Sequence, residues 1–232
     1  MLKNIIITGD VHNEFGVLNE LIDKKNPDLV ICCGDFGYWE PLVNEYNYLQ
    51  SVSKIKSKNA KILWCDGNHE HFWGLKERES DEVAPNVFYM PRGSTYTLPD
   101  GRVIMFMGGG HSIDKWNRTV GHDWFPEETI SQKDMMDLHD VKVDIFITHT
   151  CSIDILQWMI RFNEAKHCDP SNLALQVLWE KYKPYLWYFG HWHISQKGII
   201  EGTKWECLGD TRKDYKWWTI GDLELFKRLK RG

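Results

Sequence analysis

The chain has 232 residues, of which 42% are hydrophobic and 26% are charged. This balance supplies enough apolar side chains for a continuous core and argues against a disordered chain. No apolar run approaches the roughly 20 residues that a membrane-spanning helix needs, so a membrane protein is not expected. The formal net charge of -5 argues against general binding to nucleic acid.

The start of the chain and its cysteines indicate the compartment. The first residues lead directly into Ile5, Ile6 and Ile7 and lack the small-residue cleavage site of a signal peptide. The six cysteines form no C-x-x-C pair, which makes a zinc ribbon unexpected. The absence of a secretory signal makes disulfides unexpected as well. We therefore expect a cytoplasmic protein without disulfides.

Short apolar runs alternate with helical patterns along the first third of the chain. Residues 5–8, 29–33 and 61–65 are predicted strands, and residues 18–25 carry apolar side chains at helical spacing. Residues 41–58 are predicted to form an amphipathic helix, with Pro41 in its first turn. Strands separated by helices in this order indicate a parallel sheet in an α/β fold.

In the second half of the chain, predicted strands and helices alternate less regularly. Residues 103–107, 143–148 and 186–189 are predicted to be buried strands, and residues 153–162 and 172–182 to be helices. Residues 199–201 and 205–208 are predicted to form a hairpin that turns at Gly202 and Thr203. No repeat or linker interrupts the chain, so we expect one domain over residues 1–232. Residues 108–126 show no hydrophobic period, and a structureless segment of that length in a compact domain is either functional or wrongly assigned.

Five predicted strands end in polar clusters. These clusters are Gly9-Asp10-Val11-His12, Gly34-Asp35, Gly67-Asn68-His69-Glu70, Thr148-His149-Thr150 and Gly190-His191-Trp192-His193. In open α/β sheets, ligands bind outside the carboxyl ends of the strands. The clusters are therefore expected to converge on one crevice.

The residue types in these clusters are those that bind transition metals. Imidazole, carboxylate and amide oxygen together suit Mn, Fe, Zn or Co better than Ca or Mg. Asp10 and His12, like His191 and His193, are two residues apart and point to the same side of an extended segment. Each motif alone is common, and any one histidine could be a hydrogen-bonded residue at a strand end. The full set supplies too many ligands for one ion and suits two ions that share a bridging carboxylate.

The set G-D-x-H, G-D, G-N-H-E, T-H and G-H-x-H, in this order over residues 9–193, resembles the calcineurin-like metallophosphoesterase superfamily. The resemblance implies an α/β (α+β) fold, a four-layer αββα sandwich of two mixed β-sheets flanked by helices. It also implies a metal-dependent phosphodiesterase or phosphatase that uses two divalent or mixed-valence transition-metal ions such as Mn, Fe or Zn. One ion would be held by Asp10, His12, Asp35 and His193, and the other by Asp35, Asn68, His149 and His191, with Asp35 as the bridge.

The resemblance also implies catalytic roles for Asp35 and His69. A hydroxide that bridges the two ions would attack the phosphorus atom in line. His69 would lie beside the ions as a general acid or a phosphate contact, and Asn68 would also face the substrate. We expect a neighbouring carboxylate to raise the pKa of His69.

The second motif departs from one branch of the superfamily. Protein Ser/Thr phosphatases carry G-D-x-V-D-R-G there, whereas this chain has Tyr38 and Trp39 at the aspartate and arginine positions. We therefore do not expect a protein phosphatase of that branch. Arg118 is the candidate phosphate contact, because a guanidinium binds phosphate oxygens bidentately. The alternative is a surface arginine paired with Asp114.

The positions of the tryptophans give an indication of the substrate class. Five of the twelve, Trp39, Trp73, Trp116, Trp124 and Trp192, lie in or near the motif loops, where they could stack on a nucleobase or pack beneath the loops. We expect a small or nucleotide-like phosphoester as the substrate. A nuclease that acts on nucleic-acid ends and a non-catalytic scaffold are the alternatives. The scaffold is expected to lose metal ligands or His69, and all of them are present. The sequence does not indicate an oligomeric state.

Overall fold

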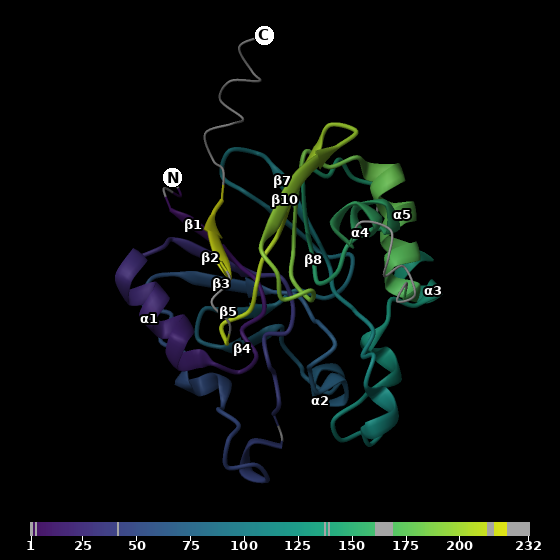
Figure 1. The fold of residues 1–232 in the computed structure, drawn as a ribbon. Helices are drawn as coiled ribbons and strands as arrows, with labels where there is room; N and C mark the ends of the chain where they lie inside the picture. Colours follow the sequence, from purple (N-terminus) through teal and green to yellow (C-terminus); the bar gives the residue numbers. More distant parts are fainter. Residues whose placement is uncertain are drawn as a thin grey trace.

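The computed structural model describes residues 2, 4–40, 42–136, 138, 140–160, 169–212 and 216–221. Two six-stranded sheets pack face to face, and helices cover their outer faces (Figure 1). The predicted four-layer sandwich is therefore confirmed. Both sheets contain parallel and antiparallel pairs.

The first sheet has the strand order β12-β1-β2-β3-β5-β4. Its central strands run parallel, and β12 pairs antiparallel with β1. The helix α1 (Phe15–Lys25) follows β1 along the chain and lies on the outer side of this sheet in Figure 1. The strands are β1 (Ile5–Thr8), β2 (Leu29–Cys32), β3 (Lys61–Trp64), β4 (Glu82–Ala84), β5 (Val87–Tyr89) and β12 (Trp218–Ile220).

The second sheet has the order β10-β11-β9-β8-β7-β6. The helices α4 (Ile153–Ile160) and α5 (Pro170–Tyr182) cover its outer side, on the right of Figure 1. The strands are β6 (Thr95–Thr97), β7 (Val103–Met107), β8 (Ile145–Thr148), β9 (Leu186–Phe189), β10 (Gln196–Ile200) and β11 (Thr203–Cys207). Two shorter helices, α2 (Phe72–Lys76) and α3 (Gln132–Met136), lie in connections.

Alternation along the strands explains how both faces of each sheet are buried. In β1, Ile5 and Ile7 point into a core that lies between the two sheets. In β2, Val30 and Cys32 point the other way and pack against α1. Because side chains alternate with a period of two, a strand that is apolar throughout can fill two core layers at once.

Two predicted elements are wrong. Residues 42–58 form no α-helix but a loop with two short 3-10 helices, Leu42–Asn44 and Val52–Lys54, and Pro41 lies outside the described residues. Asparagine, serine and tyrosine are frequent in this segment and are weak helix formers. In addition, the Asn13 side chain accepts a hydrogen bond from the backbone of Gln50 and donates one to it. These bonds hold the loop in a non-helical path.

The second error is the hairpin register. The strands are β10 and β11, and the turn is Glu201-Gly202 rather than Gly202-Thr203. Both turn residues have positive φ, at 44° and 85°, as a two-residue hairpin of the type I′ class requires. The other predicted strands and helices are present with small shifts at their ends, and residues 161–162 lie outside the described residues.

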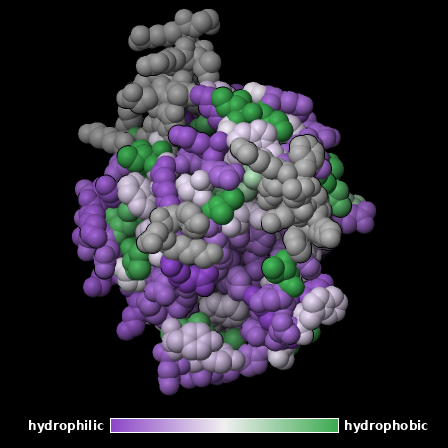
Figure 2. Space-filling view, viewed as in Figure 1, coloured by the Kyte–Doolittle hydropathy of each residue, from purple (hydrophilic) through white to green (hydrophobic). Residues whose placement is uncertain are grey.

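The surface is mainly polar, as expected when the apolar side chains are buried between the layers. In Figure 2, hydrophobic residues form small separate groups on a mainly hydrophilic face. None of the helices in the described part of the chain is long and apolar enough to cross a membrane.

Candidate metal centre

The seven candidate ligands all follow strand ends, as predicted. They lie just beyond β1, β2, β3, β8 and β9, where the carboxyl ends of parallel strands meet. Glycines allow the loops to come together there. A Cβ on Gly67 would overlap the carboxylate of Asp35, and one on Gly190 would overlap that of Asp10.

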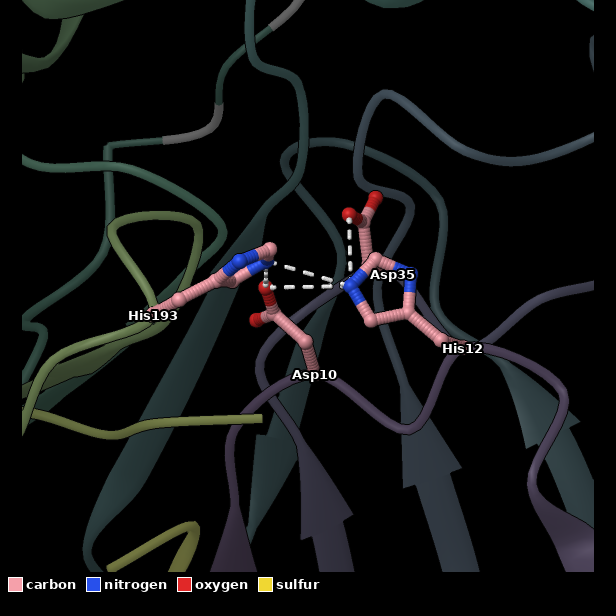
Figure 3. Close-up of side chains that lie close together, drawn as sticks. All are labelled: Asp10, His12, Asp35 and His193. Atoms are coloured by element: carbon pink, nitrogen blue, oxygen red, sulfur yellow. Dashed lines mark hydrogen bonds and ion pairs between the residues drawn. The ribbon is translucent and has the colours of Figure 1, made fainter. Parts of the chain in front are cut away.

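The first cluster consists of Asp10, His12, Asp35 and His193, whose ligand atoms all lie within 4.8 Å of one another. Figure 3 shows the four side chains pointing toward one another. His193 Nε2 lies 2.9 Å from Asp10 Oδ2 and 3.1 Å from His12 Nε2. Burial lowers the pKa of His12 to about 4, so its imidazole is neutral near pH 7, the form that binds a metal.

The second cluster consists of Asp35, Asn68, His149 and His191. Asn68 Oδ1 lies 3.0 Å from both His149 Nε2 and His191 Nδ1. His149 Nε2 lies 3.1 Å from His191 Nδ1 and 3.3 Å from Asp35 Oδ1. His149 is fully buried and His191 is partly exposed to the cleft.

Asp35 is common to both clusters, and its two oxygens face different ones. Oδ2 lies 3.7 Å from His12 Nε2, whereas Oδ1 faces His149. Oδ1 also accepts the backbone N–H groups of Asn68 and His69, at 2.8 and 2.9 Å. Burial opposes ionisation of Asp35, but His149 and the other imidazoles outweigh it and hold the pKa of this carboxyl well below its usual range.

The donor set of the second cluster fits a metal ion. His149 Nδ1 lies 3.0 Å from the carbonyl oxygen of Cys33 and donates to it, which leaves a lone pair on Nε2. That lone pair faces the oxygen atoms of Asn68 and Asp35, so a proton or a cation must lie between them. Ligands about 2.0–2.1 Å from one ion lie about 3.0–3.4 Å from each other, which matches the separations in this cluster.

The pKa of His149 supports the same conclusion. Burial opposes the charged imidazolium, but Asp35 and Asp10 outweigh it and raise the pKa of His149. The two carboxylates therefore favour one positive charge at His149, while burial and His149 lower the pKa of His191 and keep that imidazole neutral.

The backbone at these residues is strained. His12, Asp35, His191 and His193 all have positive φ, between 44° and 67°. Such conformations cost about 1–3 kcal/mol each and concentrate at functional sites. The strain fits a loop path that serves ligand placement rather than stability.

His69 and Arg118 lie beside the two clusters. The His69 ring centroid is 5.3 Å from that of His12. The Arg118 guanidinium lies 3.3 Å from His69 Nδ1 and 3.4 Å from Nε2, and it donates to Asp114 Oδ2 at 2.9 Å. Arg118 is thus paired with Asp114, but its side chain is only 13% exposed and lies beside the clusters, so it is not an ordinary surface arginine. Its contact with a phosphate stays a prediction.

The pKa of His69 is set by burial against a neighbouring carboxylate. Burial lowers it, Asp35 raises it by less, and Arg118 lowers it further, so the pKa of His69 lies below its ordinary value. Asp35 acts in the expected direction, but desolvation of the buried ring outweighs this carboxylate, so the net shift of the His69 pKa is downward.

A cleft of about 330 Å³ opens over the clusters. The segment 108–126, whose sequence shows no hydrophobic period, supplies much of the wall of this cleft. The lining residues are Asp35, Asn68, His69, His111, Ser112, Ile113, Asp114, Arg118, Asp169, His191, Trp192 and His193. Trp192 is the one tryptophan among them, and Trp116 is 85% exposed on the same segment as Arg118. Trp73 instead packs against Phe125.

Among the described contacts, Tyr38, at the aspartate position of the protein phosphatase pattern, makes no hydrogen bond to His69. Tyr38 is buried, stacks on Trp64 and accepts a hydrogen bond from Arg78. Glu70 fixes this loop instead, because it accepts the backbone N–H groups of Gly37 and Gly67. The cation beside His69 therefore comes from a different loop than in the protein phosphatase pattern.

Asp210 is a site residue that the sequence patterns missed. Its carboxylate is fully buried, and Oδ2 lies 3.0 Å from His193 Nδ1, close enough for an electrostatic contact but without hydrogen-bond geometry. A carboxylate beside Nδ1 favours the tautomer that leaves the Nε2 lone pair free for a metal. Asp210 follows Gly209 and pairs with Asp10 in an isolated bridge. A Gly-Asp pair directly after the predicted strand 205–208 is a sequence signal that could have found it.

A family model described as calcineurin-like phosphoesterase matches residues 3–195. The chain belongs to this family. Family members use divalent metals, and the Asp and His cluster described above is a potential site for them.

Similar curated proteins include lariat debranching enzymes and a nucleotide pyrophosphatase/phosphodiesterase. The lariat debranching enzyme of Danio rerio is 26% identical, over 85% of this chain and 41% of that protein. That of Schizosaccharomyces pombe is 26% identical, over 88% and 50%. The nucleotide pyrophosphatase/phosphodiesterase of Hordeum vulgare is 26% identical, over 84% and 60%. The chain thus spans between 41% and 60% of the length of these relatives.

Two solved structures show the same fold. A protein of Thermus thermophilus aligns with a TM-score of 0.53 at 14% identity and covers 90% of each chain. The phosphopantetheinyl hydrolase of Mycobacterium tuberculosis aligns with a TM-score of 0.52 at 13% identity and covers 96% of this chain and 97% of its own.

Proposed function

We propose that the chain hydrolyses a small or nucleotide-like phosphodiester or phosphomonoester with two transition-metal ions. One observation carries the proposal: the two clusters of ligand atoms share Asp35, whose oxygens face one cluster each. In this proposal Asp10, His12, Asp35 and His193 hold one ion, and Asp35, Asn68, His149 and His191 hold the other. The ions, of the Mn, Fe or Zn type, would supply Lewis acidity and a water of lowered pKa.

The side chains that face the cleft would bind the phosphate group. Arg118 offers two N–H groups of a planar guanidinium, and Asp114 restrains it through the bond at 2.9 Å. His69, whose pKa lies below its ordinary value, is neutral near pH 7. A neutral imidazole still donates one N–H to a phosphate or leaving-group oxygen. We therefore favour the phosphate contact over the general acid as the role of His69.

The cleft supports a small substrate. Its volume of about 330 Å³ is within the range of sites that enclose small molecules. Asp114 and Asp169 line it, and the chain carries a net charge of -5. These acidic groups disfavour a long polyanion in the cleft.

A panel of phosphoesters with added Mn²⁺ tests the proposal. We expect hydrolysis of bis(p-nitrophenyl) phosphate or of a nucleotide diester, and we expect Asp35→Ala and His149→Ala to abolish it. Asp23→Ala is the control, because Asp23 is an exposed carboxylate paired with Lys58. A protein that binds Mn²⁺ and hydrolyses no mono-, di- or cyclic phosphoester would contradict the proposal and favour the scaffold alternative.

A nucleic-acid phosphodiester is the second candidate substrate. The similarity to lariat debranching enzymes favours it. Branched and linear RNA oligonucleotides belong in the same panel. A kcat/KM that is higher on RNA than on every nucleotide diester would make this candidate the better one.

The cytoplasm is our proposed compartment. Cys32, Cys33, Cys65 and Cys207 are free, buried thiols, and Cys168 lies outside the described residues. Free thiols fit a reducing compartment. Fractionation with an antibody against the chain tests this proposal.

A further inference from the structure

A chain of three buried side chains runs from the second cluster to the segment that carries Arg118. Asn68 Nδ2 donates to Ser112 Oγ at 3.0 Å, and Ser112 Oγ donates to Glu128 Oε2 at 2.7 Å. The backbone N–H of Ser112 donates to the other Glu128 oxygen at 2.8 Å. The three residues are 6%, 2% and 1% exposed, so water does not compete for these bonds.

The carboxylate at the end of this chain fixes its direction. An ionised carboxylate only accepts hydrogen bonds, so the Ser112 hydroxyl must give its proton to Glu128. Ser112 Oγ then has only its lone pairs left for Asn68, so it can only accept a hydrogen bond from that residue. Asn68 must therefore present its NH₂ group to Ser112, because an amide oxygen there would face another oxygen.

This direction decides which atom of Asn68 faces the histidines. With the NH₂ group committed to Ser112, Oδ1 points to His149 Nε2 and His191 Nδ1, 3.0 Å from each. An amide in the opposite orientation would point two N–H groups at the cluster. Such an orientation would repel a cation and remove one ligand.

We propose that Ser112 and Glu128 are positioning residues that hold the carbonyl oxygen of Asn68 as a metal ligand. The inference rests on the proposed metal centre. It also connects that centre to the segment that carries Arg118 and Asp114, because Ser112 lies in this segment and accepts a hydrogen bond from Asn68. Glu128 lies in the 3-10 helix Pro126–Glu128 at the end of that segment, so a helix turn anchors the wall of the cleft.

Glu128→Gln tests the direction of the hydrogen bonds from Asn68 to Glu128, because glutamine has nearly the same shape as glutamate. The Gln amide can donate to Ser112 Oγ, which turns the hydroxyl toward Asn68 and turns the Asn68 amide around. We expect binding of the second Mn²⁺ equivalent to weaken by about 10-fold to 100-fold, as measured by calorimetric titration and by the spectrum of bound Mn²⁺. Glu127→Gln is the matched control, because Glu127 is the neighbouring carboxylate and pairs with Lys76. We expect this variant to bind both equivalents as the unmodified chain does.

Asn68→Asp makes the test independent of folding. A carboxylate at position 68 has two oxygens and can accept from Ser112 while it still offers an oxygen to a metal. Glu128→Gln is therefore expected to weaken Mn²⁺ binding when position 68 is the native asparagine, and not when it is combined with Asn68→Asp.

The outcomes separate this inference from the proposed function. Equal weakening in both backgrounds, or none in either, with two Mn²⁺ bound to the unmodified chain, would overturn the roles of Ser112 and Glu128 alone. An unmodified chain that binds no Mn²⁺ would overturn the proposed metal centre and this inference with it.

Discussion

The guanidinium of Arg118 lies against the ring of His69, 3.3 Å from Nδ1 and 3.4 Å from Nε2. These two residues are 49 positions apart and reach the cleft from different loops. Asp114 holds Arg118 in place at 2.9 Å. The arrangement supplies one cation and one neutral donor on the side of the cleft that faces the two ligand clusters.

Replacing Arg118 should weaken phosphate binding. We expect Arg118→Ala to lower kcat/KM by about 10-fold to 100-fold, because a charged hydrogen bond contributes about 1.5–3 kcal/mol. Arg118→Lys should recover part of this loss, since an ammonium lacks the bidentate fork. Steady-state kinetics on a diester measures both variants, and Arg78→Ala serves as a control for an arginine outside the cleft. An unchanged kcat/KM in Arg118→Ala would leave Arg118 as a partner of Asp114 only.

The pH dependence of His69→Ala separates its two possible roles. Burial lowers the pKa of His69, so the ring is neutral from about pH 7 upward and its N–H contact is constant there. We therefore expect the ratio of kcat/KM between the unmodified chain and His69→Ala to stay flat between about pH 7 and pH 9. A protonated general acid would instead make this ratio fall about tenfold per pH unit as pH rises.

Asp210 should support metal binding through His193. Asp210→Ala removes the carboxylate 3.0 Å from His193 Nδ1 and frees the ring to adopt the other tautomer. We expect Mn²⁺ affinity to fall by about 10-fold to 100-fold, as measured by titration calorimetry. Asp210→Asn keeps an acceptor oxygen and should lose less. If Asp210→Ala and Asp23→Ala bind Mn²⁺ equally well, Asp210 has no positioning role.

Arg92 should matter for stability and not for the metals. It donates to the fully buried Asp66 from Nε at 3.0 Å and from Nη2 at 2.7 Å. Arg92→Met leaves that carboxylate with only the Tyr89 hydroxyl among its described side-chain donors. We expect a loss of about 3–5 kcal/mol in the free energy of unfolding, measured by denaturant titration. Lys24→Met, which breaks an exposed pair with Glu20, should cost no more than about 1 kcal/mol.

The sequence could predict where the candidate ligands lie because each one follows a strong local pattern. Asp10, Asp35 and Asn68 come directly after a buried apolar run and a glycine, so the strand order alone brings them to one edge of a sheet. The core strands were predictable for the same reason. The three-residue strands β4, β5, β6 and β12 were not, because three residues are too few to show a period.

The supporting residues could not be predicted from local patterns. Ser112, Glu128 and Asp210 acquire their roles only from partners 16 to 44 positions away or on another strand. The helix prediction for residues 41–58 was wrong for a related reason. The side chain of Asn13, 37 positions away, accepts a hydrogen bond from the backbone N–H of Gln50. In each case a tertiary hydrogen bond overrides the local preference.

Anomalous diffraction from crystals grown with Mn²⁺ tests the binuclear site most directly. We predict two anomalous peaks on opposite sides of the Asp35 carboxylate, one next to His12 and His193 and the other next to His149 and His191. One peak, or none, at a Mn²⁺ concentration that saturates the solution titration would contradict the account.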